Sequence, residues 1–177
     1  MRYQLIFCAI LTFSLFFCSC KSQKESVYVI NEEDSESLVL EHIIDNIEQS
    51  SENLILIKKA KEWLGTPYRF AHSEKGKGTD CSGMVMELFK DVFDIKLPRN
   101  SEKQAEFCHQ ISFQEVSPGD LVFFATGNNR KKISHVGLMI DKKQFIHASS
   151  TKGVIISDIS TKYYKERFIM FGRVSIR

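Results

Sequence analysis

Cys81 stands where a helix is expected to begin. Asp80 is of a residue type that caps helix N-termini, so Cys81 would occupy the first helical position. Unpaired backbone N–H groups and the helix dipole favour a thiolate there, which lowers the pKa of a cysteine and makes its sulfur a nucleophile. Gly83 weakens the first turn, which is easier to explain if another group approaches the backbone closely. The unreactive alternative is a small buried cysteine that packs against its helix.

Two histidines could supply the general base that a nucleophilic cysteine needs. His135 and His147 each alternate with apolar residues, so each should lie on the opposite face of its strand from its apolar neighbours. An even number of positions separates them. A hairpin turn near residues 141–143 would therefore place both on one face, side by side or diagonally. A single histidine in a strand is often only a satisfied polar residue, but two at matched parity after a capped cysteine predict a base and its orienting partner.

Helices are expected in the first part of the folded chain. Asn53 can cap a helix that stops at Gly65, a residue suited to the left-handed closing position. That helix would carry Leu54, Ile57, Ala60, Lys61 and Leu64. A second helix should begin at Asp80, and residues 101–104 (SEKQ) have the form of a capping box for a third.

The pattern then changes to that of strands. After a turn at residues 117–120, β-branched and aromatic residues predict antiparallel strands at 121–124, 136–140, 145–148, 154–156 and 168–176. Helices followed by strands indicate an α+β fold, with N-terminal helices packed on an antiparallel sheet.

The composition is that of one folded domain. The chain has 177 residues, of which 43% are hydrophobic, and this is enough for a single core. Its 24 basic and 22 acidic side chains give a formal charge of +2, too balanced for the electrostatic footprint of a nucleic-acid binder. A monomer that binds no nucleic acid is expected.

The first residues predict export. Arg2 and the apolar run from Leu5 to Phe17 have the form of a secretory signal peptide, and the run is shorter than the about 20 residues of a membrane span. Residues 17–20 (FCSC) resemble a bacterial lipobox with Cys20 as the lipidated first residue of the mature chain. Phe17 departs from the usual Leu and leaves Cys18 as an alternative. A plain cleaved signal peptide or an uncleaved anchor would also export the domain.

Three segments are therefore expected. Residues 1–19 would be a lipoprotein signal peptide, 20–52 a lipidated N-terminus with a polar tether, and 53–177 the folded domain. Apolar residues at 37–49 have near-helical spacing, and turn-forming residues at 50–53 would interrupt it. The protein would lie in the cell envelope, anchored to a membrane and facing the periplasm or the cell exterior.

Only Cys81 and Cys108 remain in the folded body once the export segment is set aside. A disulfide between them is possible in an oxidising compartment, but the reactive surroundings of Cys81 argue against it. Cys108 and His109 are adjacent, so on a helix their side chains would point about 100° apart. Cys108 is therefore predicted to be structural.

A series of motifs resembles the NlpC-type family of cell-wall cysteine peptidases, in particular its lipoprotein members of the Spr and MepS type. The resemblance runs from about Asn53 to Arg173, with every motif in the family's order. The motifs are residues 65–70 (GTPYRF), 79–83 (TDCSG), 98–104 (PRNSEKQ), 118–124 (PGDLVFF), 135–138 (HVGL) and 147–149 (HAS).

The resemblance implies a papain-like fold that hydrolyses amide bonds in peptidoglycan stem peptides or cross-links, without a metal or an organic cofactor. It makes Cys81 the nucleophile, His135 the base that also protonates the leaving amine, and His147 the residue that orients His135. Tyr68 would help the Cys81 backbone N–H to bind the oxyanion.

The resemblance also implies that Asp80, Ser82 and Ser101 line the pocket for the stem peptide. Each has a simpler reading as a cap or as a packing residue. The chain departs from its relatives at Ala71 and His72, where many of them carry two glycines, and this puts substrate preference in doubt more than catalysis. His72 is expected to be a solvated loop residue.

Two other functions remain open on the same fold. Related cysteine enzymes transfer acyl groups or form amides, and a wall-associated lipoprotein could have lost catalysis altogether. The intact set of Cys81, His135 and His147 argues against such a loss, although an intact site does not by itself prove turnover.

Overall fold

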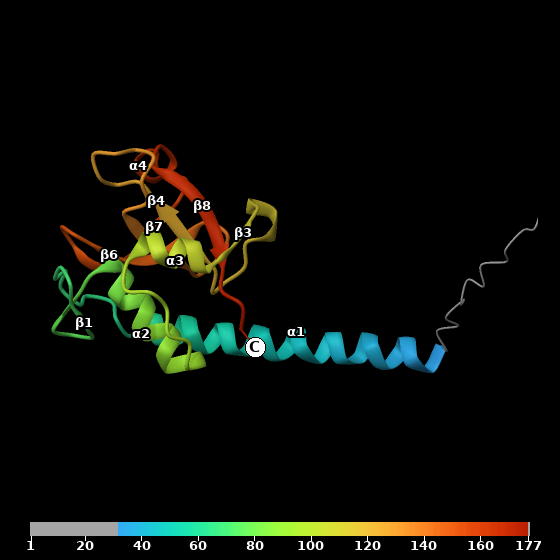
Figure 1. The fold of residues 1–177 in the computed structure, drawn as a ribbon. Coiled ribbons are helices and arrows are strands. Elements are labelled where there is room, and N and C mark those ends of the chain that lie inside the picture. Colours follow the sequence, from blue (N-terminus) through green and yellow to red (C-terminus); the bar gives the residue numbers. More distant parts are fainter. Residues whose placement is uncertain (1–31, 177) are drawn as a thin grey trace, which may run out of the picture.

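A six-stranded antiparallel sheet forms the centre of the protein (Figure 1). The computed structural model describes residues 32–176. The strand order is β3-β8-β4-β5-β6-β7. The strands are His109–Ile111 (β3), Leu121–Phe124 (β4), His135–Met139 (β5), Gln144–Ser149 (β6), Gly153–Asp158 (β7) and Phe168–Arg173 (β8). The predicted α+β fold is confirmed.

The helices are α1 (Glu32–Lys61), α2 (Cys81–Phe93), α3 (Ser101–Phe107) and α4 (Lys162–Lys165), with a 3-10 turn η1 (Phe113–Glu115). A small hairpin of β1 (Ser73–Glu74) and β2 (Gly78–Thr79) precedes α2. All five predicted strands are present, although the last ends at Arg173 and not at residue 176. Strand β3 and the small hairpin were not predicted, because two- and three-residue strands offer no alternation to recognise.

Helix α1 runs without a break through residues 50–53, so the predicted interruption and the helix cap at Asn53 are wrong. The polar side chains of this segment form hydrogen bonds with other residues of the helix. The Ser51 hydroxyl donates to the Glu48 carbonyl at 2.7 Å, and the Gln49 amide donates to the Asn53 side chain at 3.4 Å. Residues 32–52 therefore continue the first helix of the domain, and Figure 1 shows this part projecting beyond the body. Within residues 32–176, no helix has the length and apolarity to cross a membrane.

The buried face of α1 differs from the predicted one. Leu56, Ile57 and Ala60 are buried against the body, whereas Leu54 is exposed. Just after the helix, Trp63 is buried and Leu64 is exposed. Leu54 lies two positions before Leu56 and so points to the opposite side of the helix. Gly65 has the predicted left-handed conformation, with φ of +81°.

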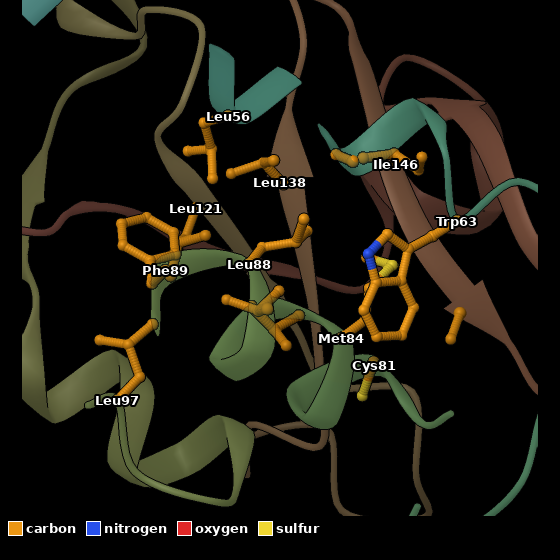
Figure 2. Packing of buried hydrophobic residues seen from close by; sticks show 14 of the residues in the cluster. Leu56, Trp63, Cys81, Met84, Leu88, Phe89, Leu97, Leu121, Leu138 and Ile146 are labelled. Atoms are coloured by element: carbon orange, nitrogen blue, oxygen red, sulfur yellow. The ribbon is translucent and has the colours of Figure 1, made fainter. Parts of the chain in front are cut away.

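The sheet is covered on both faces. Strand β4 alternates, with Leu121 and Phe123 in the cluster that α1 and α2 cover, and Val122 and Phe124 in the cluster on the other face. Figure 2 shows the first cluster, in which α2 contributes Met84, Leu88 and Phe89 and the sheet contributes Leu138 and Ile146. Because this apolar packing holds α2 against the sheet, it fixes where the first residue of α2 lies.

The predicted cap of α2 is confirmed, whereas that of α3 is wrong. Asp80 caps α2 as predicted, and its carboxylate accepts from the Gly83 N–H at 2.8 Å. The capping box at residues 101–104 is wrong, because Asn100 caps α3 by accepting from the Lys103 N–H at 2.9 Å. Ser101 is instead the first helical residue and is buried.

Two leucines of α1 give a matched test of this packing. Leu56→Ala should lower the free energy of unfolding by about 2–5 kcal/mol, because Leu56 is 0% exposed and its loss leaves a cavity. Leu54→Ala should change it by less than about 0.5 kcal/mol, because Leu54 is 65% exposed. Chemical denaturation of the protein from Lys21 onward measures both. Equal effects of the two substitutions would contradict the observed orientation of α1.

Candidate active site

Cys81 is the first residue of α2 and is buried, with 8% of its surface exposed. The loop before the small hairpin closes over this helix end. The His72 carbonyl accepts from the Asp80 N–H at 3.0 Å, and a Cβ at position 83 would lie 2.5 Å from the same oxygen. Gly83 is therefore required by a close backbone approach, as the sequence predicted. Figure 2 shows Cys81 at the edge of the core, near Trp63 and Met84.

His135 and His147 meet through their rings. The His135 Nε2 atom lies 2.9 Å from the His147 Nδ1 atom, and the rings are nearly perpendicular. Strands β5 and β6 pair Leu138 with Ile146, so the two histidines are diagonal neighbours on one face. This is one of the two predicted arrangements. It leaves Nδ1 as the ring nitrogen of His135 that takes no part in this contact.

One hollow of about 540 Å³ gathers the predicted catalytic residues. Its lining includes Tyr68, Cys81, His135 and His147. The loop of residues 149–152 forms another part of its wall. A second hollow of about 410 Å³ lies between α1 and the start of β4 and contains none of these four residues.

Burial controls the protonation of the three reactive groups. It raises the pKa of the Cys81 thiol to about 11, against the hydrogen bonds from the Val136, Ser82 and Cys81 backbone that favour the thiolate. The predicted lowering of this pKa is therefore wrong. Burial also lowers the pKa of His135 to about 4 and that of His147 to about 3. Burial therefore favours the thiol form of Cys81 and the uncharged form of both imidazoles.

Tyr68 is placed to act as a hydrogen-bond donor in this hollow. Burial raises the pKa of its hydroxyl, and the charge of Asp80 raises it further. The hydroxyl thus keeps its proton at neutral pH. This is the state required of an oxyanion-hole donor.

Asp80 and Ser82 are held by Arg99, for which no role was predicted. Arg99 donates to both carboxylate oxygens of Asp80, at 2.9 and 2.7 Å, and to the Ser82 hydroxyl at 3.0 Å. Burial alone would raise the pKa of Asp80, but the hydrogen bonds from Arg99, Gly83 and Ala71 lower it overall. A buried carboxylate at a helix cap needs a nearby cation, and this requirement could have predicted a partner such as Arg99.

Asp80, Ser82 and Ser101 are all buried and lie outside the lining of the 540 Å³ hollow. The structure thus brings the first two together through Arg99 but does not expose any of the three in that hollow. Gln104 joins α3 to the start of α2, because its amide donates to the Ser82 carbonyl at 2.9 Å.

The remaining sequence candidates lie apart from the hollow. His72 is exposed, and its ring nitrogen contacts the Phe70 carbonyl at 2.9 Å, in agreement with a loop role. Cys81 and Cys108 are both free thiols, so the disulfide is not formed. Cys108 ends α3 and His109 begins β3. Cys20 and the signal peptide lie outside the described residues.

Two residues of the same hollow that place hydroxyl groups against His147 were not predicted. Ser157 of β7 and Tyr164 of α4 each place an oxygen 3.0 Å from the His147 Nε2 atom. No local pattern marked either residue, because they reach His147 only through the pairing of β6 with β7 and the packing of α4.

Opposite substitutions in the Asp80–Arg99 pair test the electrostatics of Cys81. Asp80→Asn retains a capping oxygen but removes a negative charge that raises the pKa of Cys81, so alkylation of Cys81 by iodoacetamide at pH 8–9 should become about 3- to 10-fold faster. Arg99→Met should slow it by a similar factor, because the charge of Asp80 is then uncompensated. Peptide mass spectrometry measures the alkylation of Cys81 and of Cys108, and Cys108 serves as the internal control. A change in the same direction for both variants would contradict this account.

Comparisons with known proteins agree with the geometry. Residues 65–173 match the model of the NlpC/P60 family. A probable endopeptidase NlpC from Escherichia coli K12 is 42% identical over 114 residues, which cover 64% of this chain and 73% of that protein. The murein DD-endopeptidase MepS/murein LD-carboxypeptidase of the same organism is 36% identical over 137 residues, or 77% of this chain and 69% of that protein.

A solved NlpC/P60 family protein from Bacillus cereus superposes with a TM-score of 0.61 at 31% identity. The match covers 67% of this chain and 38% of the Bacillus protein, which is thus much the longer of the two. A family match over more than half of the chain, identities above 30% and the shared fold lead to one conclusion: this chain is an enzyme of the NlpC/P60 family of cysteine peptidases.

Proposed function

We propose that this protein is a peptidoglycan endopeptidase that hydrolyses amide bonds in stem peptides or cross-links through Cys81, His135 and His147. The observation that carries the proposal is the paired histidines in the same hollow as a cysteine at a helix N-terminus. The names of the two Escherichia coli relatives support the reaction, and that of MepS supports murein as the substrate.

The neutral resting state sets the order of the first step. Because the Cys81 thiol and the His135 imidazole are both uncharged at neutral pH, the thiol proton passes to His135 Nδ1 as the sulfur attacks the carbonyl carbon. The imidazolium that forms donates through Nε2 to His147 Nδ1, at 2.9 Å. Thiol and imidazole thus become charged only when a substrate carbonyl is present to accept the sulfur.

The negative charge then moves to the substrate oxygen. The Cys81 backbone N–H and the Tyr68 hydroxyl are the proposed donors to this oxyanion. Collapse of the tetrahedral intermediate breaks the C–N bond, and His135 gives its proton to the leaving amine. Water, deprotonated by His135, hydrolyses the resulting thioester and restores the thiol.

We also propose that Cys20 carries a lipid anchor and that residues 1–19 are removed as a signal peptide. The support is the lipobox-like sequence alone, since these residues lie outside the described part of the chain. A membrane-anchored enzyme of the cell envelope would then reach the wall through residues 21–31 and the projecting part of α1.

Defined muropeptides test the reaction. The protein from Lys21 onward keeps all of α1 and should release monomers from cross-linked dimers, or shortened stems from linear muropeptides, as seen by mass spectrometry. Released monomers would show that the cross-link is cut, and shortened stems would show that a bond within the stem is cut. Cys81→Ala should lower the rate at least about 10³-fold, because no nucleophile remains.

Cys108→Ser is the matched control, because Cys108 is a half-buried free thiol outside the hollow, and it should stay active. Absence of any Cys81-dependent product would contradict the endopeptidase. Lipid turnover by the same protein would then favour an acyl transferase, and muropeptide binding without turnover a non-catalytic wall protein.

Tyr68→Phe tests the oxyanion hole. It removes the hydroxyl and leaves the ring, so kcat should fall by about 10²–10³ while KM changes little, because the lost hydrogen bond is made mainly in the transition state. Steady-state kinetics on the cleaved muropeptide measures both constants. A rise in KM at constant kcat would instead make Tyr68 a ground-state binding residue.

A further inference from the structure

The proposed base, His135, begins a row of hydrogen-bonded side chains that continues through His147 to two hydroxyl groups. His135 contacts His147 through one ring nitrogen, and the other ring nitrogen of His147, Nε2, faces the hydroxyls of Ser157 and Tyr164 at 3.0 Å each. His147 is 1% exposed. Its hydrogen-bond partners therefore come from the protein, and the direction of these hydrogen bonds is linked to the ring nitrogen that carries the proton.

The proton positions along this row are linked. For His135 Nδ1 to accept the thiol proton, the hydrogen of neutral His135 must be on Nε2, where it donates to His147 Nδ1. His147 must then carry its own hydrogen on Nε2, which requires an acceptor. The same holds after proton transfer, because the His135 imidazolium also donates through Nε2. Only one tautomer of His147 is thus compatible with His135 acting as the base.

The opposite tautomer would disable the site. With its hydrogen on Nδ1, His147 would donate to His135 Nε2 and force the hydrogen of His135 onto Nδ1. That nitrogen would then carry a hydrogen and could not accept the thiol proton. Because burial lowers the pKa of His147 to about 3, the residue is neutral at pH 7 and must adopt one of the two tautomers.

Ser157 and Tyr164 are fixed by separate parts of the fold. Strand pairing sets Ser157 opposite Phe145, two residues from His147 on the same face of β6. The Tyr164 ring packs against Phe124 and Phe145, with centroids 5.0 and 4.8 Å apart. Both hydroxyl oxygens lie 3.0 Å from the same ring nitrogen of His147. The two hydroxyls thus form a small preorganised group aimed at a single nitrogen.

We propose that Ser157 and Tyr164 are positioning residues that accept the hydrogen of His147 Nε2 and thereby hold His135 Nδ1 free to act as the base for Cys81. This inference rests on the proposed function of the triad. Either hydroxyl can accept the same hydrogen, so the pair is redundant. Loss of one should be tolerated, whereas loss of both would leave a buried N–H without an acceptor and favour the disabling tautomer.

Nuclear magnetic resonance reads the tautomer directly. In protein from Lys21 onward labelled with ¹⁵N-histidine, long-range ¹H–¹⁵N correlations at pH 7 should show His135 and His147 in the Nε2–H form, with His147→Gln used for assignment. The Ser157→Ala/Tyr164→Phe double variant should populate the Nδ1–H form of His147. Detection of the Nδ1–H form in the wild type would overturn the proposal, whether or not the double variant folds.

Kinetics tests the redundancy. Each single variant should lose less than about 5-fold in kcat, whereas the double variant should lose about 10- to 100-fold, more than the product of the two. In the Tyr164→Phe background, Ser157→Thr keeps a hydroxyl and should therefore retain a higher kcat than Ser157→Ala. Ser160→Ala is the control, because Ser160 is exposed and bonds only to Asp158 within the described residues. A loss of kcat with the tautomer unchanged would mark a merely structural role and overturn the proposal, as would a changed tautomer at full activity.

Failure of the proposed function can be told apart from failure of this inference. If the wild type cuts no muropeptide, alkylation of Cys81 by iodoacetamide replaces kcat as the measure of base activity. The same ordering of wild type, single and double variants would then support the inference without the endopeptidase, and equal alkylation rates would overturn it.

Discussion

The carboxylate of Asp80 is the point on which the geometry of the site depends. It caps α2 through the Gly83 N–H, binds the loop before the small hairpin through the Ala71 N–H, and pairs with Arg99 through both oxygens. One buried charge thus joins the start of α2, the preceding loop and the segment that leads into α3. A buried carboxylate is stable only when its hydrogen bonds and its counter-charge are all in place, so these segments are fixed together. Because Cys81 is the next residue, its position is fixed together with that of Asp80.

Burial has opposite consequences for structure and for reactivity. The same packing that holds α2 on the sheet removes water from Cys81 and from both histidines, which favours their neutral forms. The backbone hydrogen bonds at the helix N-terminus act in the other direction but do not outweigh it. In the proposed mechanism, a neutral resting pair protects the thiol from reaction in the absence of substrate, and it makes the tautomers of the histidines important. In an ion pair the imidazolium carries both hydrogens, whereas in a neutral pair a single misplaced hydrogen removes the base.

The two sides of the site differ in how they are supported. The Cys81 side rests on charge, through Asp80 and Arg99, and that side is tied to the loop at residues 71–72, where this chain departs from the family pattern. The His147 side rests on uncharged hydroxyls and aromatic packing around Tyr164.

The sequence by itself determined those features that depend on neighbours along the chain. The cap at Asp80, the place of Cys81 at a helix start and the shared face of His135 and His147 follow from residue type and strand parity, which are local rules. Tertiary structure decided the rest. Helix α1 continues through residues 50–53 although their types favour a turn, because local propensity is weak against the bonding and packing of a long helix. Arg99, Ser157 and Tyr164 reach the site from distant segments, and the pKa of Cys81 follows burial, which is a property of the whole packed domain and not of the helix end.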